Sequence, residues 1–186
     1  MRSVAVYCAS SLGSDPRHAT AAAELGSLLA ARQIGIVYGG ASVGLMGVLA
    51  DAALAAGARV VGVIPRMLLD RELAHRGLAQ LHITTTMQQR KTLMAKLSDG
   101  FIALPGGIGT LDELFEMWTW RQLGLHQKPF GLLNFHGYYD ALLQFLDHAV
   151  ANGFLRSEIR QLLVVERDLN ALLNGLIART HTGSSP

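Results

Sequence analysis

The sequence has few charged residues, few lysines and a single cysteine, and each shortage excludes a class of protein. Only 16% of the 186 residues are charged, and the formal net charge is +2. No run of lysine or arginine interleaved with aromatic residues occurs, so the basic surface typical of nucleic-acid binding is missing. The lone Cys8 excludes an internal disulfide and is typical of a reducing compartment. We therefore expect a cytoplasmic protein without a nucleic-acid partner.

The chain is apolar, yet it lacks a long uninterrupted hydrophobic run. Half of its residues are hydrophobic, but the most apolar stretch, 43–64, is interrupted by Asp51, Gly57 and Arg59. The short apolar run at the N-terminus fits a first strand better than a signal peptide. These patterns predict no membrane association. The surplus of apolar residues then favours burial against another subunit, so we expect a homodimer or a larger assembly.

Several common site signatures are also missing from the sequence. Gly39-Gly40 followed by Gly44 lacks the glycine spacing of dinucleotide-binding folds, and no Gly-Lys-Ser/Thr triplet of a phosphate-loop ATPase occurs. None of the seven histidines stands at metal-ligand spacing. No serine lies in the elbow motif of a hydrolase. We expect no metal site, and any chemistry must depend on other motifs.

What the sequence does contain is an alternation of strand-like and helix-like segments along the whole chain. Short apolar runs, each followed by a segment with helical spacing, are typical of repeated β-α units. The expected strands are 3–8, 35–38, 59–64, 81–84, 101–104, 130–133 and 162–165. The expected helices are 14–32, 45–56, 86–98, 111–123, 138–152 and 168–179, and the charged segment 66–79 is expected to be irregular with a short surface helix.

Strands that are apolar along their whole length predict a parallel sheet covered by helices on both faces. The length, without an internal repeat or a linker, predicts a single doubly wound, Rossmann-like α/β domain over residues 1–179. Residues 180–186 are expected to form a frayed C-terminal tail. Ligands of such sheets bind beyond the carboxyl ends of the strands. Three loops of small residues fall there, 9–13, 39–44 and 105–110, and predict a nucleotide-sized cleft.

The glycine-rich segment 105–110 joins a buried strand to a helix. Its glycines let backbone amides approach a ligand, and the positive end of the helix dipole favours an anion, most often a phosphate. A carboxylate as close to that anion as Glu113 indicates a chemical role, whereas Asp112 is expected to be a first-turn acid facing solvent. The structural alternative is a capping box, in which Thr110 caps the helix and Glu113 reaches back. The segment alone does not decide between them.

A second unusual segment, 86–91, opens a helix with the two cations Arg90 and Lys91. A positive charge at the positive end of a helix costs roughly 0.3–1 kcal/mol, and a nearby anion or carboxylate would remove that cost. For Lys91 alone, exposure to solvent is an equally simple explanation. The serines of the other two loops are either hydroxyl donors to a ligand or loop formers; these are Ser10, Ser11 and Ser42.

Together the two unusual segments resemble the paired signature of the lonely-guy family, which consists of cytokinin-activating nucleoside 5′-monophosphate phosphoribohydrolases. The matching residues are Met87, Arg90, Lys91, Pro105, Gly106, Gly107, Gly109, Thr110 and Glu113, with further matches at 7–11, Gly39, Gly40 and 44–47. Gln88 stands where the family is expected to have histidine. Members are often labelled lysine decarboxylases, but nothing around the three lysines resembles the Schiff-base site of a pyridoxal enzyme.

The resemblance implies hydrolysis of the N-glycosidic bond of AMP or N6-modified AMP to a free base and ribose 5-phosphate, with no cofactor. It implies that Glu113 stabilises the oxocarbenium-like charge and orients water, while Arg90 pairs with it and contacts the ligand. The implied substrate-binding residues are Ser10, Gly39, Gly40, Met87, Lys91, Gly106, Gly107, Gly109, Thr110 and Glu116. A homodimer with its sites near the interface is also implied. The alternative is a non-catalytic carrier of a phosphorylated cofactor, like the molybdenum-cofactor carriers that resemble this family.

Overall fold

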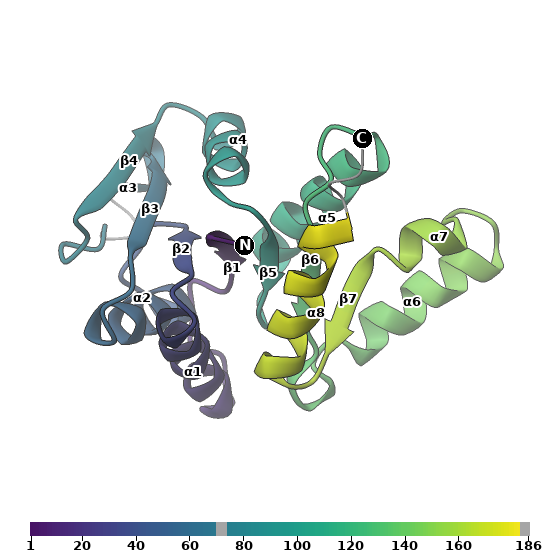
Figure 1. The fold of residues 1–186 in the computed structure, drawn as a ribbon, viewed down its shortest axis with the longest axis horizontal. Helices are drawn as coiled ribbons and strands as arrows, with labels where there is room; N and C mark the ends of the chain where they lie inside the picture. Colours follow the sequence, from purple (N-terminus) through teal and green to yellow (C-terminus); the bar gives the residue numbers. More distant parts are fainter. Residues whose placement is uncertain (70–73, 183–186) are drawn as a thin grey trace.

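The computed structural model describes residues 1–69 and 74–182, which form one seven-stranded sheet with helices on both faces (Figure 1). The strand order is β4-β3-β2-β1-β5-β6-β7, and every neighbouring pair is parallel. The strands are β1 Ser3–Tyr7, β2 Gly35–Tyr38, β3 Val60–Pro65, β4 Gln80–Thr84, β5 Phe101–Ala103, β6 Phe130–Leu133 and β7 Leu163–Glu166. The predicted doubly wound α/β fold is thereby confirmed.

The helices divide between two hydrophobic cores, one on each face of the sheet. They are α1 Arg17–Ala31, α2 Gly44–Ala55, α3 Arg66–Leu69, α4 Met87–Leu97, α5 Ile108–Gln122, η1 Phe135–Gly137, α6 Asp140–Ala151, α7 Ser157–Arg160 and α8 Leu169–Thr182. Buried residues of α1, α2 and α8 pack in one core, and those of α4, α5 and α6 pack in the other. Strands with apolar side chains on both faces are what this double covering requires.

The order in which the chain adds strands to the sheet reverses at β1. The chain first adds β2, β3 and β4 on one side of β1, and then returns to place β5 on the other side. The register pairs Tyr7 with Ala103, and the Leu104 amide donates to the Tyr7 carbonyl over 2.9 Å. The loops that follow β1 and β5 therefore emerge side by side, which is where ligands bind in sheets of this kind.

Most predicted segments agree with the structure to within two residues at each end, and the differences have simple causes. Helix α5 begins at Ile108, three residues before the expected start, because its first turn carries no apolar spacing that a pattern could detect. The short elements η1 and α7 were not expected from the sequence. Helix α8 continues to Thr182; the rest of the expected tail, and residues 70–73 of the expected irregular segment, lie outside the described residues.

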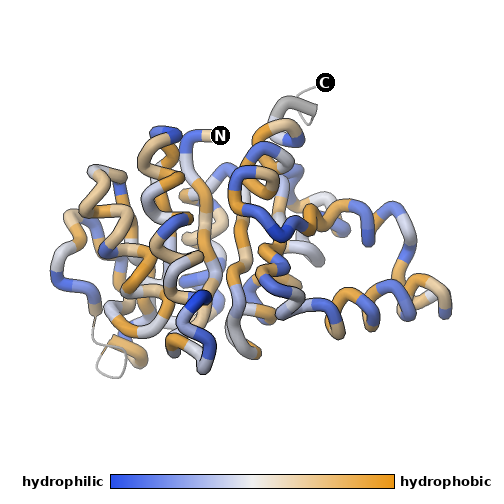
Figure 2. The backbone as a smooth tube through the Cα atoms, turned by 90° about the horizontal axis from the view of Figure 1, so that it is seen from below, coloured by the Kyte–Doolittle hydropathy of each residue, from blue (hydrophilic) through white to orange (hydrophobic). Residues whose placement is uncertain are grey.

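Helices α6 and α7 project from the β7 side of the molecule (Figures 1 and 2). Leu146 is the one buried residue of the twelve in α6, a helix that lies wholly within the described residues. Phe145 is 64% exposed, and Phe154, which follows the helix, is 91% exposed. This projecting part of the fold leaves large apolar side chains uncovered.

Candidate active site

A cavity of about 280 Å³ lies at the carboxyl ends of the central strands, where the chain reverses across the sheet. The segment after β1, the end of β2 and the helices α2, α4 and α5 all contribute to its wall. The lining residues are Val6, Cys8, Ala9, Ser10, Ser11, Gly39, Met46, Met87, Arg90, Gly107, Ile108, Gly109, Thr110, Asp112 and Glu113. All three predicted loops and the start of α4 therefore contribute to one cavity, although the second loop does so through Gly39 alone.

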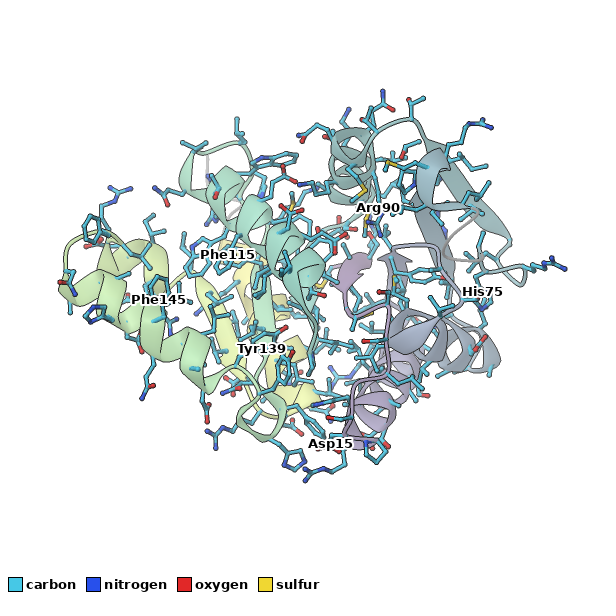
Figure 3. All side chains as sticks on the ribbon, turned by 180° about the vertical axis from the view of Figure 1, so that it is seen from behind. Asp15, His75, Arg90, Phe115, Tyr139 and Phe145 are labelled. Atoms are coloured by element: carbon cyan, nitrogen blue, oxygen red, sulfur yellow. The ribbon has the colours of Figure 1, made fainter. Side chains whose placement is uncertain are left out.

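Arg90 and Glu113 form a buried ion pair on the wall of this cavity. Arg90 Nη1 lies 3.2 Å from Glu113 Oε1, and the two side chains are 8% and 9% exposed. Arg90 Nε also donates to the Val63 carbonyl over 3.0 Å, so the guanidinium is held from β3 as well as from α5. Buried charges persist in proteins when they are paired and hydrogen-bonded, as here. Figure 3 labels Arg90 on the inner side of α4.

Gly39 makes room for this arginine. A Cβ atom at position 39 would lie closer to Arg90 Nη2 and to Met46 Sδ than real side chains approach. A side chain at this position would force the ends of Arg90 and Met46 to shift, so the glycine leaves the guanidinium its present place on the cavity wall. Gly40 differs, because it does not line the cavity; its φ is +78°, and its carbonyl accepts from the His75 amide over 3.0 Å.

The capping-box interpretation of Thr110 and Glu113 is wrong. Helix α5 is capped by Gly107 in an extended conformation, without a side-chain cap, so Thr110 lies inside the first turn. Both side chains are buried, and the Glu113 carboxylate is directed to Arg90 instead of the start of the helix. Asp112 is correspondingly not in the first turn, and its carboxylate pairs with Lys91 instead of facing only solvent.

The start of α5 provides the features of an anion site. Gly107, Gly109 and Thr110 line the cavity, and a Cβ at either glycine would meet no atom within 4 Å, so the backbone there is open to a ligand. The first amides of a helix have no partner within the helix, and the helix dipole adds positive potential. Glu113 follows Gly109 by roughly 6 Å along the axis, a span comparable to a ribose 5-phosphate. One helix thus presents an anion site and a carboxylate to one cavity.

Lys91 and Glu116 pair with each other beside the cavity instead of lining it. Lys91 Nζ lies 3.0 Å from Glu116 Oε2 and 3.0 Å from Asp112 Oδ2, and its side chain is 11% exposed. Burial lowers the pKa of Lys91, but hydrogen bonds and charges from Glu116 and Asp112 outweigh it and raise this pKa above its ordinary value. These ion pairs tie α4 to α5 next to the Arg90–Glu113 pair.

The structure thus brings most of the predicted site residues together. Ser10, Gly39, Met87, Arg90, Gly107, Gly109, Thr110 and Glu113 line the cavity, whereas Gly40, Lys91, Gly106 and Glu116 do not. The predicted site residues did not include seven that line the cavity, which are Val6, Cys8, Ala9, Ser11, Met46, Ile108 and Asp112. For Met46 a signal existed, because it lies in one of the segments that match the family. Ile108 lies in the segment 105–110 that was expected at the cleft, but the periodicity did not reveal that it begins a helix.

Cys8 lines the cavity but is unsuited to act as a nucleophile. Burial, followed by the negative charge of Glu113, raises the pKa of its thiol well above the ordinary value. The same two causes, burial first, raise the pKa of the neighbouring Tyr7 hydroxyl. A thiol that stays protonated at neutral pH is a poor nucleophile and a poor metal ligand. The Glu113 carboxylate, which pairs with Arg90, is the more suitable group for chemistry in this cavity.

Within 1–69 and 74–182, no group of three or more histidine, cysteine, aspartate or glutamate side chains could hold a metal ion. In the same part of the chain, no helix combines the length and the apolar character needed to cross a membrane.

Known proteins resemble this chain in sequence and in fold. The family model described as "Possible lysine decarboxylase" matches residues 46–176. Cytokinin riboside 5′-monophosphate phosphoribohydrolase LOG1 of Arabidopsis thaliana is 49% identical over 161 residues, which cover 87% of this chain and 76% of the relative. The enzyme LOG7 of the same plant is 46% identical over 173 residues, which cover 93% and 80%.

A solved structure shares the fold at lower identity. The molybdenum cofactor carrier protein of Chlamydomonas reinhardtii superposes with a TM-score of 0.70 at 20% identity, covering 97% of this chain and 98% of the carrier. Identity this low shows a common fold alone. The sequence matches are closer and cover most of both proteins, so the chain belongs to the lonely-guy family of cytokinin riboside 5′-monophosphate phosphoribohydrolases, whose family model bears the lysine decarboxylase description.

Proposed function

We propose that this protein hydrolyses the N-glycosidic bond of AMP or of N6-modified AMP, such as a cytokinin riboside 5′-monophosphate, and releases the free base and ribose 5-phosphate. The buried Arg90–Glu113 pair on the wall of the cavity carries this proposal. The names of the relatives, which are close in sequence, support it. A buried carboxylate beside an anion site is expensive to maintain, and a reaction that develops positive charge gives it a purpose.

In this reaction the 5′-phosphate binds the free amides at the start of α5. The ribose then extends along the helix, so that C1′ approaches the Glu113 carboxylate. The C1′–N bond breaks with its electron pair remaining on the base, which takes up a proton. A water molecule adds to C1′ and loses a proton, which completes the ribose 5-phosphate product. Glu113 stabilises the oxocarbenium-like transition state and orients that water.

Arg90 supports this role of Glu113. A cation that pairs with a buried carboxylate favours its charged form, and the bond to the Val63 carbonyl fixes where the guanidinium lies. Arg90 also lines the cavity and would contact the ligand. We assign the two residues to a single catalytic unit.

The remaining predicted residues divide into two groups in this proposal. Ser10, Gly39, Met87, Gly107, Gly109 and Thr110 line the cavity and would surround the nucleotide directly. Gly40, Lys91, Gly106 and Glu116 stand behind the wall and would hold the loops and the helices α4 and α5 in place. The site would use no cofactor. The reducing cytoplasm is a suitable compartment, because Cys8 in the wall would remain a thiol.

We also propose a homodimer whose interface includes the space between α5 and α6. Phe115, Trp118, Leu146 and Leu155 line an apolar groove there, and Figure 3 labels Phe115 on α5 and Phe145 on the neighbouring α6. Because α5 also forms a wall of the cavity, a partner seated in this groove would place both sites near the interface. Light scattering at micromolar concentration tests this, and a monomeric mass would contradict it.

The alternative function is that of a carrier, which binds a phosphorylated cofactor without turnover. The fold shared with the Chlamydomonas carrier supports it, whereas the Arg90–Glu113 pair favours the enzyme. Chromatographic product analysis with AMP, an N6-prenylated AMP and the corresponding nucleosides distinguishes the two. The enzyme releases free base from the monophosphates. A protein that binds AMP and returns it unchanged, under conditions where an N6-prenylated AMP is also unchanged, would be a carrier.

A further inference from the structure

Two adjacent tyrosines hold the chain that leads from β5 into α5. The Tyr138 hydroxyl donates to the Gly106 carbonyl over 2.9 Å, and the Tyr139 hydroxyl donates to the Leu104 carbonyl over 2.8 Å. Both tyrosines belong to the connection between β6 and α6, and Tyr139 is labelled in Figure 3. The glycine segment is therefore held from outside by a neighbouring loop. Nothing in the proposed reaction uses these hydroxyls.

The bond from Tyr138 determines which way one backbone amide points. In a trans peptide the carbonyl of one residue and the N–H of the next point to opposite sides. The Gly106 carbonyl is held by Tyr138, and Gly106 does not line the cavity, whereas Gly107 does. The N–H of Gly107 is thereby directed away from Tyr138. This amide is one of those at the start of α5 that are free to bind an anion.

This peptide group needs such a restraint because it lies between two glycines. Glycine tolerates conformations that other residues avoid, so a Gly-Gly peptide rotates at little cost. A rotated group would turn the Gly106 carbonyl oxygen, with its partial negative charge, toward a bound anion. No side chain at position 107 opposes the rotation, because a Cβ there would meet no atom within 4 Å.

The Tyr138 ring is itself fixed, although half of the side chain is exposed. It packs edge-on against His18, with the ring centroids 5.4 Å apart, and edge-on against Tyr139 at 4.7 Å. His18 belongs to α1, so Tyr138 connects the glycine segment to a helix of the opposite core. Two such contacts restrict where the hydroxyl can lie.

We infer that Tyr138 is a positioning residue, which holds the Gly106–Gly107 peptide group so that the Gly107 amide faces the phosphate of a sugar phosphomonoester. The inference rests on the proposed function for the identity of that ligand. It adds a residue outside the family motif, acting through the loop and not through contact with the substrate. Its effect therefore appears in the affinity for phosphate-bearing ligands.

The test is the Tyr138→Phe variant, which removes the hydroxyl and keeps the ring. Calorimetric titration with ribose 5-phosphate is expected to give a dissociation constant about tenfold higher than that of the wild type, as for loss of one hydrogen bond to a charged group. In steady-state kinetics, the KM for AMP is expected to rise by about the same factor, while kcat changes less than about threefold. Ribose, which lacks the phosphate, is expected to bind both proteins equally.

Tyr38→Phe is the matched control. The Tyr38 hydroxyl is buried and has no hydrogen-bond partner among the described residues, so its removal is expected to leave both ligands unaffected. Equal affinity of wild type and Tyr138→Phe for ribose 5-phosphate would overturn the inference. Equal weakening of ribose would also overturn it, because that result indicates general damage to the site.

Two measurements on the wild type, the binding of ribose 5-phosphate and the hydrolysis of AMP, distinguish a failure of this inference from a failure of the proposed reaction. A wild type that binds ribose 5-phosphate no better than ribose contradicts the anion site and the role of Tyr138 together. A wild type that binds ribose 5-phosphate but leaves AMP intact contradicts the reaction alone. In that case the ratio of the two dissociation constants, Tyr138→Phe over wild type, still decides the role of Tyr138.

Discussion

Helices α5 and α6 follow neighbouring strands of the same sheet, yet they distribute charge and apolar surface in opposite ways. Helix α5 buries Glu113 next to Arg90, together with core residues such as Leu114 and Trp118. Helix α6 buries a single residue and leaves Phe145 exposed. Each helix breaks the rule that charges lie outside and apolar groups inside. In our proposal, α5 contributes to a site for a small ligand, and the exposed side chains of α6 contribute to an interface with a second subunit.

Removing the buried cation is expected to have the largest effect on this arrangement. Arg90→Ala removes the cation that pairs with the buried Glu113 carboxylate, which we expect to cost about 3 kcal/mol of the free energy of unfolding. Turnover of AMP is expected to fall by roughly 10²–10⁴-fold, because the two residues act as a unit. Urea unfolding and initial rates measure the two effects. The double variant Arg90→Ala/Glu113→Gln is expected to lose little more activity than either single variant; additive losses would contradict a common unit.

Filling the space beside the cation is expected to have the next largest effect. In Gly39→Ala the new methyl group would clash with Arg90 Nη2 and Met46 Sδ, so we expect the guanidinium to shift and its ion pair with Glu113 to weaken. We expect a fall in kcat/KM of at least about tenfold and a loss of roughly 1–3 kcal/mol in the free energy of unfolding. Gly57→Ala is a control for a glycine with space around it, although its φ of +79° carries its own backbone cost. An unchanged kcat/KM for Gly39→Ala would show that Arg90 can be displaced harmlessly.

Lys91→Met tests the second set of ion pairs between α4 and α5. The variant is expected to lose about 2 kcal/mol in the free energy of unfolding, less than a fully buried pair because Asp112 is half exposed. Since the folded-state pKa of Lys91 is raised, its contribution is fully present below the unfolded-state value of 10.5 and is lost as pH rises through the folded-state pKa. Wild type and variant should therefore converge in stability above that pH. Equal stability at pH 7 would contradict a structural role for these pairs.

Phe145→Glu tests the exposed apolar surface of α6. Of the substitutions considered, it is expected to affect activity least. Phe145 is exposed in the single chain, so the free energy of unfolding of an isolated subunit should change by less than about 0.5 kcal/mol. Light scattering is expected to show a dimer for the wild type and a shift toward monomer for the variant. Glu24, exposed on α1, offers a control position as Glu24→Lys, which should leave the mass unchanged. A dimer that survives Phe145→Glu would place the interface away from the exposed face of α6.

The sequence predicted the fold well because its signals are local and repeated. Apolar runs and helical spacing locate the seven strands and the long helices, and strands apolar throughout imply a sheet covered on both faces. The short elements were not predicted, because a segment of four residues, such as α7, is too short to show a helical period. The early start of α5 was not predicted either. Its first residues, Ile108, Gly109 and Thr110, face the cavity or solvent and have no apolar spacing.

The candidate site was predictable only in part. The motifs identified the segments that meet at the cavity, but spacing along the chain does not reveal which side chain of a motif faces the ligand. Lys91 adjoins Arg90 in sequence, yet it points to Asp112 and Glu116, because successive helix residues face different directions. The bond from Tyr138 to Gly106 spans 32 positions and has no signature in the sequence at all.

The charge of Glu113 is the central claim, and one measurement tests it most directly. Release of base from AMP is compared between wild type and Glu113→Gln, with the folded state of each checked by urea unfolding. Glutamine keeps the size of the side chain but removes the charge, so turnover is expected to fall by roughly 10²–10⁴-fold while the protein remains folded. Asp112→Asn, the neighbouring substitution of the same kind, is expected to change turnover less than about tenfold. A folded Glu113→Gln protein with turnover close to that of the wild type would contradict the account.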